Sequence, residues 1–399
     1  MGATDFTRDG RPYSYDDLPR GRSDPRLSQF SITHDEAYII PALRQMLALN
    51  PHVKILATPW SPPAWMKTNH ALDNKANGGM LKLSAYRPLA RYFVKFIQAY
   101  ARHRIPIAAL TPQNEPGQQT SYPGLNWSEP DEARFIVHDL SPALKAAGLR
   151  PRIYGLDLIW AAESYAASLI QTSAARTIAG IAWHCYIGDP AAMAMLRELD
   201  PGREQIESEC SSGISPGPVA ELVIASARSW ASTVLLWNLA LDPSGGPVRR
   251  PNNGCQGCTA VVTVHQRART VSYSRDYYEL GQASKFIRPG ARRVGAENFV
   301  NYLFRSARLG NGYASPGLDD VAFENRDGSN VLLAYDSAPL AERFVVQWRG
   351  SSFSYTLAPG ATVTFVWGGR GGLPVAHAGR FSSTARQPRD LTPAAPPPR

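Results

Sequence analysis

The sequence predicts an α/β fold built on a parallel sheet, followed by a smaller antiparallel β-sandwich. Between residues 53 and 241 six short apolar segments alternate with stretches of helical periodicity, and after Pro289 short alternating strands are separated by turn residues. Alternation of strands with helices implies a parallel sheet with right-handed crossovers, either doubly wound or closed into a barrel. Hydrophobic residues make up 44% of the chain, which is enough to build a packed core.

Local patterns predict the elements of the first part. The segment VKILATPW (53–60) has the length and composition of a buried strand, and residues 86–103 place Leu89 and Phe93 on one helical face. A helix near 131–147 is introduced by the signal Ser-Glu-Pro-Asp at 128–131, with proline early and acids in the first turn. After a loop-like stretch at 1–35, the predicted strands are 53–60, 107–116, 152–158, 180–186, 205–209 and 232–241, and the predicted helices are 86–103, 131–147, 162–176, 190–199 and 218–230.

The character of the chain changes after Asp242. A loop rich in Gly, Pro, Asn and Cys and a β-rich run form a predicted insertion at about 242–273, and one last helix is predicted around Asp276–Phe286. Asp327-Gly328 between two alternating runs is a hairpin signal. The predicted domains are the α/β domain at 1–287, the β-sandwich at 288–369 and a disordered Pro/Ala/Arg-rich tail at 370–399.

Charge and hydropathy disfavour two classes of protein. The net charge of the 399-residue chain is +9, but the last thirty residues hold five arginines and one acid and so carry +4 of it. The remaining chain is only mildly basic, which argues against a nucleic-acid partner. No apolar run reaches the length of about 18 residues that a transmembrane segment needs. The polar start MGATDFTRDG predicts no signal peptide.

Two carboxylates stand at predicted carboxyl ends of strands, where α/β barrels carry their chemistry. Glu115 closes the strand IAALTPQNEP, and Glu209 closes QIESE three strands later. In a barrel they would face each other across the mouth, and glycoside hydrolysis requires such a pair, one protonated and one ionised. The alternative is that these acids pair with Arg or Lys. Glu207 is the one rival to Glu209, because it lies on the same face of the strand.

Aromatic side chains at the same strand ends strengthen the prediction of a sugar site. Trp60, Trp65, Tyr186 and Trp237 fall at or just past strand ends, where ordinary core packing would favour Val, Ile or Leu. The apolar faces of sugar rings stack on such side chains. The alternative for each of them is a large core residue near the rim of the sheet.

Other motifs are weaker. The segment GISPG (213–217) has the spacing of a nucleophile elbow, but that turn needs the backbone N–H after the serine, and Pro216 has none. Cys255 and Cys258 form one CxxC without a second pair, which favours a local disulfide over a zinc site, with free thiols as the alternative. His184 has no second histidine placed for a metal, so we interpret it as a hydrogen-bonding residue of the pocket or core.

These residues lie in stretches that resemble glycoside hydrolase family 30, in particular its glucosylceramidase (acid β-glucosidase) members. The stretches run in family order across nearly the whole chain to about residue 368, which makes the resemblance more specific than any single motif. They are ATPWSPPAWMKTN (57–69), RYFVKFIQAYARH (91–103), LTPQNEP (110–116), GIAWHCY (180–186), IESECSSG (206–213), WNLALDPSGGP (237–247) and YYELGQASKFIRPGARRVG (277–295).

The resemblance implies a fold, a reaction and a set of site residues. The implied fold is a (β/α)8 TIM barrel followed by an antiparallel β-sandwich, and the implied reaction is a retaining hydrolysis of β-glucosidic bonds that needs no metal and no cofactor. Glu209 matches the nucleophile of the family and Glu115 the acid/base. The matching substrate-binding positions are Asp5, Trp60, Asn114, His184, Tyr186 and Trp237. The implied partner is a carbohydrate or glycolipid, and the implied location is extracellular.

One departure from the family pattern concerns the start of the chain. Residues 1–6 match the loop just after the second barrel strand, so the resemblance implies that strands one and two and an N-terminal part of the sandwich are missing. We hypothesise a truncated product or a start assigned at an internal methionine, with any signal peptide lost. Such a short form is expected to have low stability and weak or no activity, because its barrel would keep unpaired edges. The alternatives for function are an endo-acting β-1,6-glucanase or xylanase, and an inactive carbohydrate-binding protein.

Overall fold

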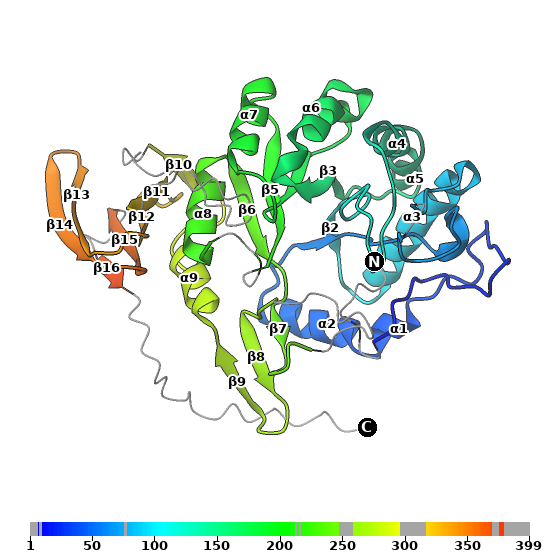
Figure 1. The fold of residues 1–399 in the computed structure, drawn as a ribbon, viewed down its shortest axis with the longest axis horizontal. Coiled ribbons are helices and arrows are strands. Elements are labelled where there is room, and N and C mark those ends of the chain that lie inside the picture. The colour runs from blue at the N-terminus through cyan, green and yellow to red at the C-terminus, as the bar shows by residue number, and fades with distance from the viewer. Residues whose placement is uncertain are drawn as a thin grey trace.

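The computed structural model of the 399-residue chain is drawn in Figure 1. It describes residues 7, 10–75, 78–211, 214, 217–246, 258–295, 317–368 and, for the backbone only, 375–378. These residues form a parallel sheet flanked by helices, a small three-stranded sheet, and two antiparallel sheets near the end of the chain.

The first part of the chain is built on a six-stranded parallel sheet whose strands pair in sequential order. A doubly wound sheet reverses its strand order at a switch point, whereas a barrel does not, so the barrel prediction is confirmed. Among the described strands, β1 and β6 have one neighbour each, and the sheet is a curled, open part of a barrel. The strands are β1 (Ile55–Ala57), β2 (Ile107–Leu110), β3 (Arg152–Ile159), β4 (Gly180–His184), β5 (Glu204–Cys210) and β6 (Ala231–Leu236).

Helices connect these strands at the predicted positions. The predicted helix at 131–147 is observed as three consecutive segments. A π-helical turn at Ile136–Leu140 lies between α4 (Glu129–Phe135) and α5 (Ser141–Ala146). The Ser128 hydroxyl caps α4 by accepting from the Asp131 N–H, as the start signal predicts. The other helices up to β6 are α1 (Thr33–Glu36), α2 (Ile39–Leu49), α3 (Tyr86–Arg102), α6 (Glu163–Gln171), α7 (Ala191–Leu199) and α8 (Val219–Arg228). In the part of the chain that the structure describes, no helix is both long and apolar enough to cross a membrane.

A buried apolar core lies between the sheet and its helices. Tyr92 and Phe93 of α3 are completely buried in it, in agreement with the apolar face predicted for that helix. Trp65 belongs to the same core, where its indole Nε1 donates to Asp16 Oδ2 at 2.9 Å. Of the strand-end aromatic residues, Trp65 is therefore a core residue.

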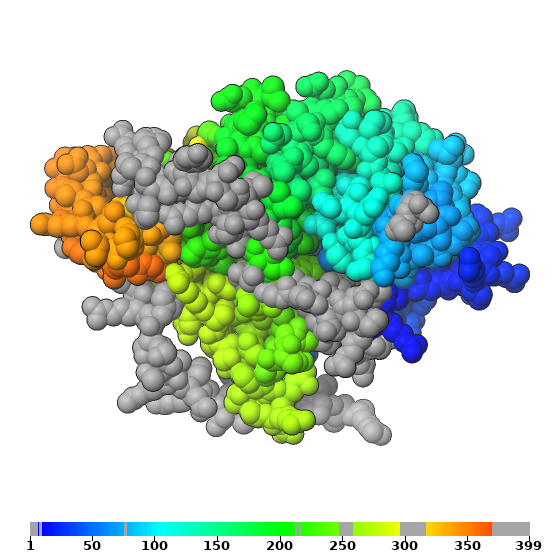
Figure 2. Space-filling view, in the orientation of Figure 1, coloured from blue at the N-terminus to red at the C-terminus, as the bar shows by residue number. Residues whose placement is uncertain are grey.

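The predicted insertion follows β6 and forms the small sheet. Strand β7 (Ala240–Leu241) pairs with β8 (Val262–His265), which forms a hairpin with β9 (Thr270–Tyr273). Figure 2 shows this hairpin, in yellow-green, projecting from the lower side of the molecule. Helix α9 (Arg275–Ser284) then leads into the last part of the chain.

Two antiparallel sheets form the predicted β-sandwich. One contains β10 (Arg292–Val294), β11 (Leu318–Glu324), β12 (Ser329–Asp336), β15 (Thr362–Gly368) and β16 (Val375–Ala378), and the other pairs β13 (Glu342–Trp348) with β14 (Ser351–Leu357). Apolar residues of both sheets pack around Phe365, which is 1% exposed. The structure differs from the predicted disorder of the tail at Val375–Ala378, because β16 pairs with β15 there. The remainder of that tail lies outside the described residues, and the domain boundaries stay a prediction.

Candidate active site

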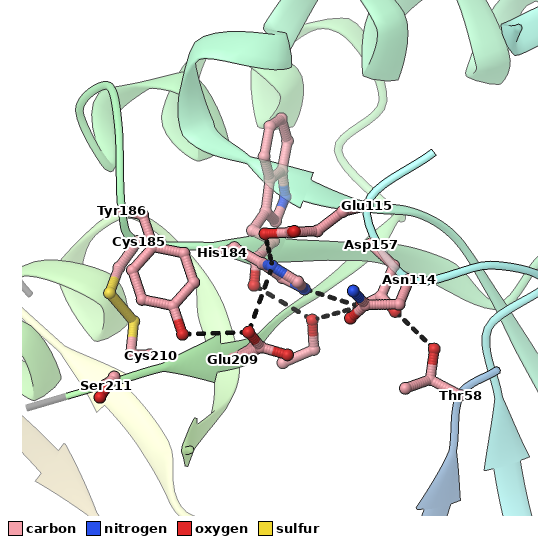
Figure 3. Close-up of polar contacts among 12 residues, drawn as sticks. Thr58, Asn114, Glu115, Asp157, His184, Cys185, Tyr186, Glu209, Cys210 and Ser211 are labelled. Atoms are coloured by element: carbon pink, nitrogen blue, oxygen red, sulfur yellow. Dashed lines mark hydrogen bonds and ion pairs between the residues drawn. A yellow bond between two sulfur atoms is a disulfide. The ribbon is translucent and has the colours of Figure 1, made fainter. Parts of the chain in front are cut away.

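Successive parallel strands bring polar side chains to one edge of the sheet, at the carboxyl ends of the strands. Because the strands are neighbours in chain order, residues far apart in the sequence meet there, as Figure 3 shows. Thr58 follows β1, Glu115 follows β2, Asp157 lies in β3, His184 ends β4 and Glu209 lies in β5.

His184 lies at the centre of this group and is completely buried. Its Nδ1 is 3.2 Å from Glu115 Oε1 and 3.9 Å from Glu209 Oε1, and its Nε2 is 3.2 Å from Asp157 Oδ1. Burial alone would lower the pKa of His184, but the surrounding carboxylates, Glu209 foremost, raise it well above its ordinary value. This environment favours the imidazolium form, whose two N–H groups donate to carboxylates on both sides of the ring.

Asp157 binds Nε2 of His184 and was not identified from the sequence. Thr58 and Thr111 donate to its Oδ2 at 2.7 Å each, and Ser208 donates to its Oδ1 at 2.7 Å. Burial would raise the pKa of Asp157, but the hydrogen bond and charge of His184, with the hydroxyl donors, lower it. A lone carboxylate inside the apolar strand RIYGLDLI is the sequence signal that could have identified it.

Glu209 is 8% exposed and accepts a hydrogen bond from the Tyr186 hydroxyl on its Oε1 at 3.0 Å. Burial raises the pKa of Glu209; the charge of His184 opposes this, and the nearby Glu115 and Asp157 raise it further. One carboxylate oxygen of Glu115, one of Glu209 and one ring nitrogen of His184 lie within 4.8 Å of one another. Retaining glycosidases hold their two carboxyl groups about 5–5.5 Å apart and inverting enzymes about 6.5–9.5 Å, so this pair has the closeness of the retaining class.

An aromatic wall adjoins Glu115. Trp60 and Trp237 stack with ring centroids 5.3 Å apart, and Tyr122 packs against Trp60 at 5.0 Å. The Tyr122 hydroxyl donates to Glu115 Oε2 at 3.1 Å, which links the wall to the carboxylates. Trp60 and Trp237 thus lie together, and their role in binding a sugar stays a prediction. Tyr122, which completes the wall, was not identified from the sequence.

Two polar atoms beside this wall have unused hydrogen-bonding capacity. Among the described residues, Trp60 Nε1 and Asn114 Oδ1 are buried without a hydrogen-bond partner. Buried polar atoms without partners are costly, and both of these atoms lie near the carboxylate pair. One donor and one acceptor next to an aromatic wall suit the hydroxyl groups and apolar face of a sugar.

Glu207, the rival of Glu209, has a separate environment. It is completely buried, and its Oε2 accepts from the indole Nε1 of Trp160 at 2.8 Å. Burial raises the pKa of Glu207 well above its ordinary value, which favours the neutral acid. In the described structure, Glu209 is the member of this pair that joins Tyr186, His184 and Glu115.

The cysteines form a bond that the sequence did not predict. Cys185 and Cys210 are joined by a disulfide between the ends of β4 and β5. Two groups in the described chain have side-chain atoms close enough to share a metal ion, Glu115–His184–Glu209 and Cys185–Glu207–Cys210. The disulfide in the second group and the charged His184 in the first give these atoms other partners.

Two predicted residues cannot be placed. Asp5 and Cys255 lie outside the described residues, so a role of Asp5 in substrate binding and the Cys255–Cys258 pairing stay predictions. Cys258 itself is disulfide-bonded, and its Sγ lies 3.0 Å from the Ser211 hydroxyl.

A barrel sheet with two close carboxylates at its carboxyl edge, followed by a β-sandwich, defines the class of barrel glycosidases. Comparison with known proteins agrees. Residues 1–214 match the TIM-barrel domain of glycosyl hydrolase family 30, and residues 290–365 match the beta sandwich domain of that family. The chain belongs to glycoside hydrolase family 30.

Individual relatives carry different names. An endo-1,6-beta-D-glucanase of Neurospora crassa is 33% identical over 80% of this chain and 66% of its own length. The lysosomal acid glucosylceramidase of Mus musculus is 29% identical over 92% of this chain and 72% of its own. The crystal structure of SrfJ from Salmonella typhimurium superimposes with a TM-score of 0.80 at 28% identity, covering 92% of this chain and 79% of that one. The chain spans about two thirds of the length of the Neurospora relative.

Proposed function

We propose that this protein is a retaining β-glycosidase in which Glu209 is the nucleophile and Glu115 the acid/base. The observation that carries the proposal is the closeness of the two carboxylates, whose nearest oxygens lie with His184 inside 4.8 Å. That spacing suits direct attack by a carboxylate and leaves little room for the water of an inverting mechanism. The assignment of the two roles follows the matching family positions.

The proposed reaction has two steps. Glu209 attacks the anomeric carbon while Glu115 donates a proton to the leaving oxygen, and an ester forms between the sugar and Glu209. Glu115 then takes a proton from water, which attacks the same carbon and releases the sugar with its configuration retained. Asn114 hydrogen-bonds the sugar 2-hydroxyl, and the Trp60–Trp237 wall stacks on the ring.

The first step needs a proton on the acid/base and an ionised nucleophile. Burial raises the pKa of Glu209, and the charge of His184 opposes this. Attack requires the proton to lie on Glu115, and hydrogen bonding of Glu115 to the leaving oxygen of a bound sugar favours that arrangement.

Trapping of the covalent intermediate tests the proposal. The 399-residue chain is incubated with an activated 2-deoxy-2-fluoro-β-glucoside, and the labelled residue is located by peptide mass spectrometry. A single turnover is enough for labelling, so a slow enzyme is detected. The expected label is on Glu209, and Glu209→Gln abolishes it. Glu115→Gln is still labelled, because an activated leaving group needs no acid.

Each other result of the trapping experiment is informative. A label on Glu115 would reverse the two roles. Absence of any label, with the sugar still bound in a calorimeter, would contradict the enzyme and support the carbohydrate-binding alternative.

For the substrate we propose a β-1,6-linked glucan. The support is that the fungal relative named an endo-1,6-beta-D-glucanase is more identical to this chain, at 33%, than the mouse glucosylceramidase, at 29%. Glucosylceramide is the second candidate, because the mouse relative matches over the larger share of this chain, 92% against 80%.

A substrate panel separates these candidates. Linear β-1,6-glucan and glucosylceramide in detergent micelles are compared at equal glucosyl concentration, with products resolved by chromatography. Release of short oligosaccharides from the glucan, with little ceramide formed, is the expected result, and the opposite preference would contradict it.

We also propose an extracellular location from the family resemblance. Detection of the protein in the culture medium tests this location.

A further inference from the structure

The Cys185–Cys210 disulfide lies among the residues of the candidate site. Cys185 separates His184 from Tyr186 in the chain, and Cys210 directly follows Glu209. Both cysteines are completely buried, and Figure 3 shows their bond beside the Tyr186–Glu209 hydrogen bond. One covalent link therefore connects the backbone segments that carry three of the polar site residues.

The strand pairing is irregular where this link occurs. Trp183 pairs with Glu207 and His184 pairs with Glu209, so Ser208 is an extra residue in β5. Beyond that point, Cys185 N–H donates to the Glu209 carbonyl at 3.3 Å, a long hydrogen bond. A bulge disrupts the regular ladder, so the ladder alone constrains these strand ends less than it constrains the middle of the sheet.

The geometry around Glu209 depends on the relative position of these two strand ends. Tyr186 and His184, both on the β4 side, approach the same Glu209 oxygen at 3.0 and 3.9 Å. A shift of β4 against β5 would lengthen both contacts together. Hydrogen bonds weaken steeply beyond their normal range, so a small shift would remove the Tyr186 bond.

We propose that the Cys185–Cys210 disulfide is a positioning element of the site, which holds the ends of β4 and β5 so that Tyr186 and His184 both face Oε1 of Glu209. The inference rests on the proposed function for its effect on catalysis, because it deepens the role given to Glu209. The geometric part, the placing of His184 against Glu209, has a readout that is independent of activity.

The test compares two variants in which a pair of cysteines is removed. Cys185→Ala/Cys210→Ala removes the disulfide without leaving a buried thiol, and Cys255→Ala/Cys258→Ala is the matched control that removes the other two of the four cysteines. Thermal unfolding of each variant first establishes that it folds. Values of kcat and KM for an aryl β-glucoside are then measured between pH 4 and 9, and the ring of His184 is titrated by NMR.

The Cys185→Ala/Cys210→Ala variant is expected to lose kcat by about tenfold or more with little change in KM, because misplacement of a reacting group acts on the chemical step. Its His184 midpoint falls to lower pH, because Glu209 makes the largest contribution that raises the pKa of His184. The alkaline limb of the kcat profile moves in the same direction. The titratable groups that face His184 from the surrounding strands are Glu115, Asp157, Glu207, Glu209 and Tyr186.

A disulfide that only stabilises the fold would lower the melting temperature and leave the kcat profile and the His184 midpoint at their wild-type values. That result would overturn the proposal, as would an equal change in the control variant. If the wild-type protein is not labelled by the fluoroglucoside, the proposed function fails, but the His184 midpoint still decides whether the disulfide positions the site. If the Cys185→Ala/Cys210→Ala variant fails to fold, the Cys255→Ala/Cys258→Ala protein is compared before and after reduction by dithiothreitol, which supplies two electrons and two protons per disulfide and there acts on the Cys185–Cys210 bond alone.

Discussion

Asp157 is one of the carboxylates that favour a charged His184 in the site. It is 2% exposed, yet three hydroxyl groups and one imidazolium satisfy its carboxylate. An ionised carboxylate buried in this way keeps His184 charged, and the charge of His184 lies between the two glutamates. Asp157 therefore acts on Glu115 and Glu209 through His184, without contacting a substrate itself.

Asp157→Asn is expected to reduce the rate of glucosylation in the trapping assay by about 10²-fold, which is the lower end of what positioned acid–base groups contribute. Loss of the carboxylate also lowers the pKa of His184, so the alkaline limb of the pH–rate profile moves to lower pH. Ser208→Ala is the control, since it removes one hydrogen bond and leaves the charge. A pH profile of Asp157→Asn identical to the wild type would contradict this role.

At the scale of elements, an irregularity in β3 directs Asp157 into the site. The pairing of β3 with β4 shifts between Leu156 and Leu158, and both Leu156 and Asp157 have positive φ angles, of 74° and 54°. The Leu156 N–H, freed from the ladder, donates to Glu132 Oε1 of α4 at 3.1 Å. Glu132 Oε2 accepts from the Tyr165 hydroxyl of α6 at 2.8 Å, so one buried carboxyl joins three elements.

Glu132→Gln is expected to change the pH dependence of stability. Burial raises the pKa of Glu132 from 4.5 to about 7, so the folded protein keeps this proton at pH values where the unfolded chain has released it. The contribution of Glu132 to stability is thus complete below about pH 4.5 and is lost as the pH rises to about 7, a difference of about 3 kcal/mol. The free energy of unfolding of the wild type relative to Glu132→Gln should fall by that amount over this interval.

Urea unfolding at several pH values measures this difference. Glu163→Gln on the surface of α6 is the matched control, because it removes a carboxyl that is exposed and not buried. A constant difference for Glu132→Gln as well would show that the buried carboxyl does not hold the extra proton.

At the scale of the molecule, α8 joins the barrel to the sandwich. Its residues Val219 and Val223 pack with Val321 of β11 and Leu333 of β12 in one buried cluster. The side chains of Arg228 and Asp320, 8% and 10% exposed, form an ion pair at 2.9 Å across the same junction. Figure 1 shows α8 and α9 between the parallel sheet and the sandwich strands. The two parts therefore share buried apolar and charged contacts.

Arg228→Ala is expected to lower the free energy of unfolding by about 3 kcal/mol, because removal of one partner leaves a buried charge without compensation. Equilibrium unfolding in urea measures the loss. Arg288→Ala, which removes the exposed ion pair with Asp327, is the control and should leave stability unchanged. Equal effects of the two substitutions would show that the Arg228–Asp320 pair contributes no more to the free energy of unfolding than an exposed ion pair.

The sequence by itself determined the class of fold, most elements and the two carboxylates, because hydrophobic periodicity and strand-end position are local properties of the chain. It also indicated Trp60, Tyr186 and Trp237 from their places at strand ends and His184 as a hydrogen-bonding residue of the pocket or core, whereas Asn114 was indicated only through family resemblance. The roles of these residues stay proposals.

Only the tertiary structure decided which side chains meet. The contact of Tyr122 with Glu115 joins residues 7 positions apart, the Cys185–Cys210 bond joins residues 25 positions apart, and the contact of Thr58 with Asp157 joins residues 99 positions apart. The β3 irregularity that presents Asp157 depends on strand register. The tertiary structure also decided that Trp65 belongs to the core and that β16 pairs with β15. The physical reason is that burial, hydrogen-bond partners and pKa depend on neighbours across strands, and those neighbours are fixed by the folded sheet.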